Sequence, residues 1–176
     1  IQLPFTLDTT LQQAGSATTV KHCKLSTTGL DLLAEGAFVS ATGMLQLKGS
    51  LTPDFDTLFT AIPQLAENRK TFAISGKHTR DFTIEAPVTQ GLPGIINYGE
   101  ATAEIAFDTV TVPGLDIPNG AVNLTLREGV MAIDGIIPVN EGTVQLQPRL
   151  SMMGNTPILS WAPDGKILDR VRLTQK

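Results

Sequence analysis

Alternation of apolar and polar side chains, interrupted by turn residues, is the feature that most limits how this chain can fold. It is clearest over residues 101–150, where four short runs alternate in this way. A period of two places successive side chains on opposite faces of a pleated strand, so each run has one apolar and one polar face. The turns between the runs carry residues that accept tight or left-handed backbone. They are Pro113-Gly114, Pro118-Asn119-Gly120, Glu128-Gly129, Asp134-Gly135 and Asn140-Glu141-Gly142. This stretch predicts an antiparallel meander with one apolar surface.

The rest of the chain repeats the pattern in shorter pieces. Residues 72–74 and 82–88 are predicted to form a hairpin, and residues 90–99, which contain glycine and proline, are predicted to be a loop. Further strands are predicted over residues 5–11, 18–25, 30–33, 36–41, 44–51, 157–161 and 167–173.

One amphipathic helix is predicted over residues 52–67. Thr52 suits the N-cap, Pro53 suits the first helical position, and apolar residues then recur at helical spacing. They are Phe55, Leu58, Phe59, Ile62 and Leu65. Because acidic residues flank this face where a membrane-surface helix would carry Lys or Arg, we expect the helix to pack on the sheet.

Length and composition agree with a β-rich domain. A chain of 176 residues is large enough for one domain with a sizeable core. Charged residues make up 17% of it, below the usual ~25%, which suits the exposed face of a sheet better than that of a helical bundle. The predicted fold is mainly all-β, a curved antiparallel meander forming a groove or open barrel, with the helix packed on its apolar face. Residues 1–176 are predicted to be a single domain and a fragment of a longer protein.

Charge and cysteine content exclude several classes of partner and structure. The net charge is −4 and the basic residues are scattered, which argues against nucleic acid as a partner. Cys23 is alone, so an internal disulfide cannot form. No run approaches the ~18 to 20 apolar residues that a membrane-spanning helix requires.

Residues able to support catalysis or metal binding are few. His22, His78 and Cys23 cannot supply the usual four Cys/His ligands of a structural zinc site. His22 and Cys23 are neighbours on a predicted strand and point to opposite faces, so they cannot pair. The Gly-x-Ser-x-Gly elbow and the phosphate-binding Gly-Lys-Ser/Thr loop are both missing from the sequence. We therefore predict a protein that is not an enzyme and has no catalytic residue, metal or cofactor.

The apolar face is the candidate site. Only one helix is predicted to cover a long apolar sheet, and a curved sheet of this kind leaves a trough that can hold acyl chains without specific polar contacts. The residues predicted to line it are Leu45, Leu47, Ile105, Phe107, Leu124, Leu126, Val144 and Leu146, with Phe55 and Phe59 closing it.

The alternation of hydrophobic and polar residues, interrupted by glycines, resembles that of the AsmA-like bacterial envelope proteins. The resemblance rests on residues 99–120, 122–126, 127–133, 140–146 and 157–159, about half of the chain, and more loosely on residues 30–51. It implies a member of the repeating β-groove group that includes the AsmA and TamB types. Such proteins are anchored in the inner membrane, extend a hydrophobic β-groove through the periplasm and handle phospholipid transfer in outer-membrane biogenesis. The resemblance further implies a phospholipid or other acyl-chain ligand, and end-to-end contact with neighbouring segments of the parent chain.

Two other functions remain open from the residues alone. A structural or adhesion β-sandwich would bury its apolar faces fully against each other, whereas a trough leaves apolar surface open. A glycan-binding β domain would present converging carboxylates or exposed aromatic platforms, and aromatic residues are only 5% of this chain.

Overall fold

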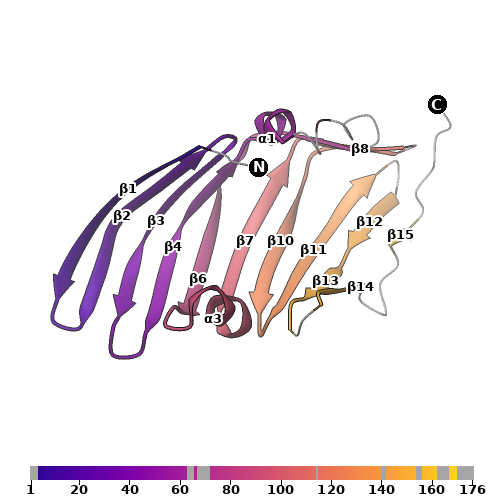
Figure 1. Cartoon of the computed structure of the whole chain (residues 1–176). Coiled ribbons are helices and arrows are strands. Elements are labelled where there is room, and N and C mark those ends of the chain that lie inside the picture. The colour runs from indigo at the N-terminus through magenta and orange to yellow at the C-terminus, as the bar shows by residue number, and fades with distance from the viewer. Residues whose placement is uncertain are drawn as a thin grey trace.

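A computed structural model shows one large antiparallel sheet that is curved and does not close on itself (Figure 1). The structure describes residues 4–62, 66, 72–113, 115–139, 142–153, 156–161 and 167–169. The predicted fold class, a mainly β chain with an antiparallel meander, is confirmed.

The strand order in the large sheet is close to the order of the strands in the sequence. Most strands pair with the strand of this sheet that comes immediately before or after them in the chain. Its main path is β1-β2-β3-β4-β6-β7-β10-β11-β12-β15, and β13 pairs with both β11 and β14. The first strands are β1 (Phe5–Ala14), β2 (Ala17–Thr27), β3 (Leu30–Val39), β4 (Met44–Pro53), β6 (Arg80–Pro87) and β7 (Glu100–Phe107). The later ones are β10 (Gly120–Arg127), β11 (Val130–Val139), β12 (Gly142–Leu146), β13 (Pro148–Ser151), β14 (Ile158–Trp161) and β15 (Leu168–Asp169).

A smaller sheet is formed by β5 (Ala73–Ser75), β8 (Thr109–Val112) and β9 (Leu115–Ile117). The predicted hairpin between residues 72–74 and 82–88 is therefore wrong: β5 pairs with β8, and β6 pairs with β4 and β7. A strand of three residues is too short for its sequence to specify its partner strand. Here β5 pairs with the Thr-Val segment of β8, which is itself extended. The hydroxyls of Ser75 and Thr109 meet across that pair at 2.6 Å.

Helix α1 (Phe55–Ala61) begins later than predicted. Asp54 is its N-cap, and the Asp54 carboxylate accepts a hydrogen bond from the N–H of Thr57 at 3.0 Å. Thr52 and Pro53 belong to the end of β4, where Pro53 pairs with Leu30. Residues 63–65 and 67 of the predicted helix lie outside the described residues.

Helix α3 (Gly91–Tyr98) occupies the segment predicted to be a loop, so that prediction is wrong. Pro93 lies in the first turn of the helix, where backbone N–H groups have no partner within the helix, so its missing N–H removes no helical hydrogen bond. Helix α1 and the smaller sheet lie at one end of the long strands, and α3 lies at the other (Figure 1).

Strand β3 runs unbroken through the site where two short strands, 30–33 and 36–41, are predicted. The reason is a close backbone approach between β3 and β4 at two glycines. A Cβ atom at Gly36 would lie 1.9 Å from the carbonyl oxygen of Gln46, and one at Gly49 would lie 1.8 Å from that of Leu33. Glycine leaves room for this close approach, and the β3–β4 ladder keeps its register through both positions.

Strand pairing keeps apolar side chains on one face across the sheet. Cross-strand neighbours share a face, so each set of paired positions forms a row running across the strands. One row is Leu7, Leu25, Leu32 and Leu51; the next is Cys23, Ala34, Gly49, Phe82, Ala103, Leu124 and Ile133; the next is Leu47, Ile84, Ala101, Leu126, Met131 and Leu150. The opposite face carries ion pairs such as Lys48–Glu35 at 3.2 Å and Arg149–Asp134 at 2.8 Å.

The buried core lies at the end of the sheet beneath the smaller sheet. Its members are Phe107, Ile117, Ile137, Val139 and Val144, with Phe55, Ile74, Val110, Val122 and Leu146 packed against them. The chain exposes 11,208 Å² of surface, whereas a compact protein of 18.7 kDa exposes about 8,300 Å². The fold is thus an open sheet with a core at one end.

Candidate functional site

An apolar hollow on the uncovered part of the sheet is the candidate site. Its volume is about 240 Å³, and it extends across β3, β4, β6, β7, β10 and β11. We call it the apolar trough. Its apolar lining residues are Leu32, Leu51, Phe82, Ile84, Ala101, Ala103, Leu124, Leu126 and Met131.

The hollow follows from where small residues stand in the ladder. Phe82 is paired with Ala103, which is paired with Leu124, and the next row repeats the arrangement with Ile84, Ala101 and Leu126. Strand β7 thus contributes alanines between large side chains of β6 and β10. The alanines leave a low floor along β7, between the higher side chains of β6 and β10.

Polar chemistry is nearly missing from the trough. Among the described residues that line it, Thr83, Thr102 and Thr125 are polar and none is charged. These threonines alternate with the apolar lining residues, so their side chains point to the opposite face, where the hydroxyls of Thr83 and Thr102 meet at 2.7 Å. Arg80 is paired with Leu51 in the ladder, but it lies outside the lining and forms an ion pair with Glu104. The trough can therefore exclude water from an apolar ligand but offers no charge to orient one.

The structure separates the residues predicted to line a single face. Leu124 and Leu126 line the trough. Leu45, Leu47 and Ile105 are half-buried on the same face, outside its lining. Phe107, Val144 and Leu146 belong to the core beneath the smaller sheet, which places them away from the open part.

The two phenylalanines predicted to close the trough lie at the covered end. Phe55 packs against the core cluster from α1, which is the expected packing of this helix on the apolar face. Phe59 is buried, and its ring centroid lies 5.6 Å from that of Phe72. Neither contributes to the trough lining, so α1 leaves the trough uncovered.

Several trough residues were missed by sequence reasoning. Alternation alone places Leu32, Leu51 and Ile84 on an apolar face, and these three lining residues could therefore have been predicted from the sequence. Ala101 and Ala103 were not among the predicted lining residues, although their small size creates the hollow. Phe82 is 6% exposed and stands opposite Gly49, a pairing that only the strand register reveals.

A larger hollow of about 610 Å³ lies mainly on the polar face, over β2, β3, β4 and β6. Its lining includes Lys21, His22, Glu35, Lys48 and Asp81. Lys48 and Glu35 pair at 3.2 Å with side chains 72% and 61% exposed, so water screens them strongly. Its opposed charges and wide exposure favour a solvated surface over a ligand site.

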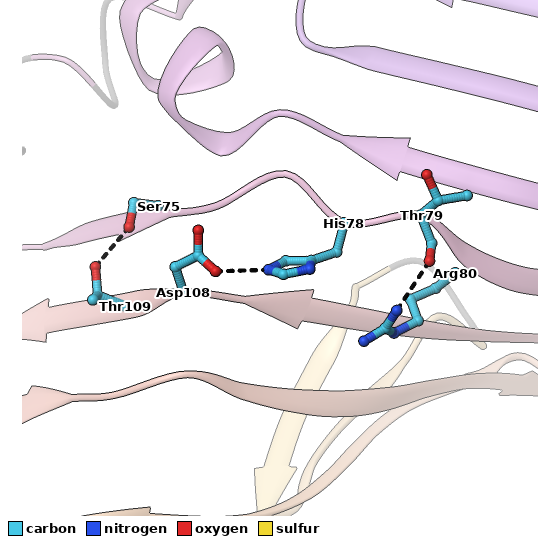
Figure 2. A network of polar contacts seen from close by, with 6 residues as sticks. All are labelled: Ser75, His78, Thr79, Arg80, Asp108 and Thr109. Atoms are coloured by element: carbon cyan, nitrogen blue, oxygen red, sulfur yellow. Dashed lines mark hydrogen bonds and ion pairs between the residues drawn. The ribbon is translucent and has the colours of Figure 1, made fainter.

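The closest approach to a catalytic arrangement lies beside the smaller sheet (Figure 2). His78 Nε2 lies 2.8 Å from the Asp108 carboxylate, and the Ser75 hydroxyl bonds Thr109 on the far side of Asp108. Ser75 therefore does not bond the imidazole, and a Ser-His-Asp relay is not formed. The contact joins the β5–β6 connection to the β7–β8 junction, where the Asp108 N–H also donates to the Ser75 carbonyl at 2.9 Å.

Two further observations bear on the site. Among the described residues, no three His, Cys, Asp or Glu side chains gather in a way that would hold a metal ion. Neither described helix has the length and apolar character needed to cross a membrane.

Comparison with protein-family models, with curated proteins and with solved structures finds no match to this chain.

Proposed function

We propose that the chain is a non-enzymatic lipid-binding segment whose apolar trough holds an acyl chain. The observation that carries the proposal is an open hollow with apolar walls, an alanine floor and no charged side chain in its described lining. Lipid tails need apolar surface and no directional polar partner, which is what such a hollow offers.

The apolar lining is long enough, measured across the strands, to contact a whole lipid tail. The trough reaches from β3 to β11 over six neighbouring strands, and at ~4.8 Å between strands this is roughly 24 Å. One leaflet of a bilayer has a hydrocarbon depth of roughly 15 Å, half of the ~30 Å core. The lining is therefore longer across the strands than a membrane-lipid tail, which would lie over the side chains of β6 and β10 as well as over the β7 floor and stay partly exposed.

The expected affinity is modest because the trough covers only one side of the tail. Full burial is worth ~0.8 kcal/mol per methylene, so half burial of a tail of about 15 methylenes gives ~6 kcal/mol. That free energy corresponds to a dissociation constant in the tens of micromolar. Weak binding of this kind suits a surface along which lipids move.

The cellular setting is proposed from the resemblance to AsmA-like proteins. On this proposal the chain is part of a periplasmic groove in the cell envelope. Its parent protein is anchored in the inner membrane, and the ligand is a phospholipid on its way to the outer membrane.

Binding is tested with the fluorescent fatty acid cis-parinaric acid and with native mass spectrometry of protein purified from bacterial cells without detergent. We expect probe binding with a dissociation constant in the tens of micromolar, and co-purifying phospholipid. Ala103→Trp should fill the trough floor and weaken probe binding at least five-fold. Ala121→Trp is the matched control, because Ala121 lies on the opposite face of β10, paired with Ala106.

A clean ligand-free mass together with no probe uptake would contradict the proposal and favour a structural or adhesion domain. Equal loss of binding in both tryptophan variants would show that the probe does not occupy the trough. Probe binding displaced by oligosaccharide instead of phospholipid would support a glycan-binding domain.

A further inference from the structure

The floor of the apolar trough is short and nearly as wide as it is long. Ala101 and Ala103 form it, and they stand two residues apart on β7, roughly 7 Å along the strand. The flanking strands β6 and β10 are two strand spacings apart, roughly 10 Å. The lowest part of the trough is therefore a patch and not a channel.

Larger elements close this patch at both ends of β7. Helix α3 contacts both β6 and β10 at one end (Figure 1). A Cβ atom at Gly99, which ends this helix, would lie 3.0 Å from that of Ala86, and Ala86 is 1% exposed on the trough face of β6. Toward the other end β7 continues on the trough face with half-buried Ile105 and then with Phe107 of the buried core. An extended chain lying on the floor therefore has no room to continue along β7.

Large side chains stand on the two remaining sides of the floor. They are Phe82 and Ile84 on β6, and Leu124 and Leu126 on β10. Phe82 is 6% exposed, so its ring is held in place by its neighbours, and the three aliphatic side chains are half-buried. A group that fills the space over the alanines contacts both flanking strands at once, and such contacts add up because each contributes a small dispersion attraction.

We infer, on the basis of the proposed lipid-binding function, that the alanine floor is a subsite for a compact cyclic group carried by the acyl ligand. An apolar cavity of about 150 Å³ is enough to hold benzene, and the hollow over the floor measures about 240 Å³. One ring fills the patch, whereas an extended chain places only a few of its methylenes over the floor. The linear remainder of the ligand lies over the neighbouring apolar rows.

Displacement of bound cis-parinaric acid by two acids with the same number of carbons tests the subsite. The pair is ω-cyclohexylhexanoic acid and dodecanoic acid, which share the carboxylate and differ in whether half of the carbons form a ring. The ring compound has less apolar surface, so a sheet without a subsite would bind it no better than the linear acid. We expect the ring compound to displace the probe at about a five-fold lower concentration, because its ring contacts both flanking strands.

Two leucine variants locate the preference. Ala103→Leu should bring the displacing concentrations of the two acids within about two-fold of each other, because the added side chain occupies the floor. Thr102→Leu is the matched control and should keep the preference. Thr102 is exposed, and its side chain lies on the opposite face of the same strand. Circular dichroism establishes that both variants are folded, and the comparison of the two acids on the unaltered chain does not depend on either variant.

The outcomes separate this subsite from the proposed function. If the probe binds and dodecanoic acid displaces it as well as the ring compound does, the subsite is overturned and lipid binding stands. A ring preference that persists in folded Ala103→Leu would also overturn the subsite, because the ring would then lie elsewhere. No probe binding at all would contradict the proposed function itself, and the subsite with it.

Discussion

The end of the sheet beneath β5, β8 and β9 and the part that carries the trough are built from the same alternating strands, but their apolar faces have different surroundings. At the covered end Ile137 is 1% exposed and Val139 is 2% exposed. In the outermost strand of the open part, Leu7 and Leu11 are 56% and 58% exposed. The two regions use side chains of similar size and polarity, so composition does not separate them.

What separates them is the partner layer. The smaller sheet supplies Ile74, Val110 and Ile117 to one end, and together with Phe55 these side chains seal it. The trough rows have no such layer among the described residues, and the alanines of β7 lower their floor further. Alternation therefore specifies which face is apolar, whereas long-range pairing decides whether that face is closed.

The largest expected effect compares one substitution in both regions. Phe107 is 4% exposed beneath the smaller sheet, and Phe82 is 6% exposed in the trough wall. Phe107→Ala should lower the free energy of unfolding by about 3–5 kcal/mol, since it leaves a sealed cavity. Phe82→Ala should cost about 2–3 kcal/mol, because the vacated space opens to water and only the transfer free energy is lost. Urea unfolding measures both, and equal losses would indicate that the trough is closed in solution.

The next comparison uses neighbouring isoleucines on β11. Ile137 points into the sealed core at 1% exposure, while Ile136 points to the other face at 68% exposure. Ile137→Ala should destabilise the chain by about 2–5 kcal/mol. Ile136→Ala should change stability by less than about 0.5 kcal/mol, as exposed positions do. If the two variants lost similar stability in urea, the assignment of the β11 faces would be wrong.

The smallest effect concerns the helix that borders the covered end. A hydrogen bond from the Thr57 backbone N–H, with a further contribution from Lys77 at 3.4 Å, lowers the pKa of Asp54 below 3.8. Because the folded pKa is the lower one, this stabilisation is present above about pH 4 and is lost as the pH falls through the folded pKa. Asp54→Asn should therefore have a lower melting temperature than the unaltered chain at pH 7, and the difference should shrink at pH 2.5. A difference that stays constant would show that the Asp54 charge plays no part.

Much of the strand framework could be predicted from local patterns. The β10–β11 hairpin was indicated by Glu128-Gly129, and both residues have the positive φ angles, 50° and 72°, that a two-residue hairpin turn uses. The apolar face was also predictable, and Leu124 and Leu126, predicted to line the site, line the trough. These features depend on residues close together in the sequence.

The remaining features required contacts between distant residues. The pairing of β5 with β8 joins segments about 35 residues apart, and no local signal distinguishes it from the hairpin predicted with β6. Helix α3 was obscured by Gly91, Pro93 and Gly94, which are typical of loops but here lie in the first half of a helix. The division of the apolar face into a sealed and an open part depends on where the smaller sheet docks.

By itself, the sequence determined that the chain forms antiparallel strands with one apolar face, because side-chain period and turn residues act over a few positions. Only the tertiary structure decided where that face is sealed and where the alanines of β7 meet the large side chains of β6 and β10. These outcomes depend on strand register and on the packing of one sheet against another, which are set by pairings between segments far apart in the chain.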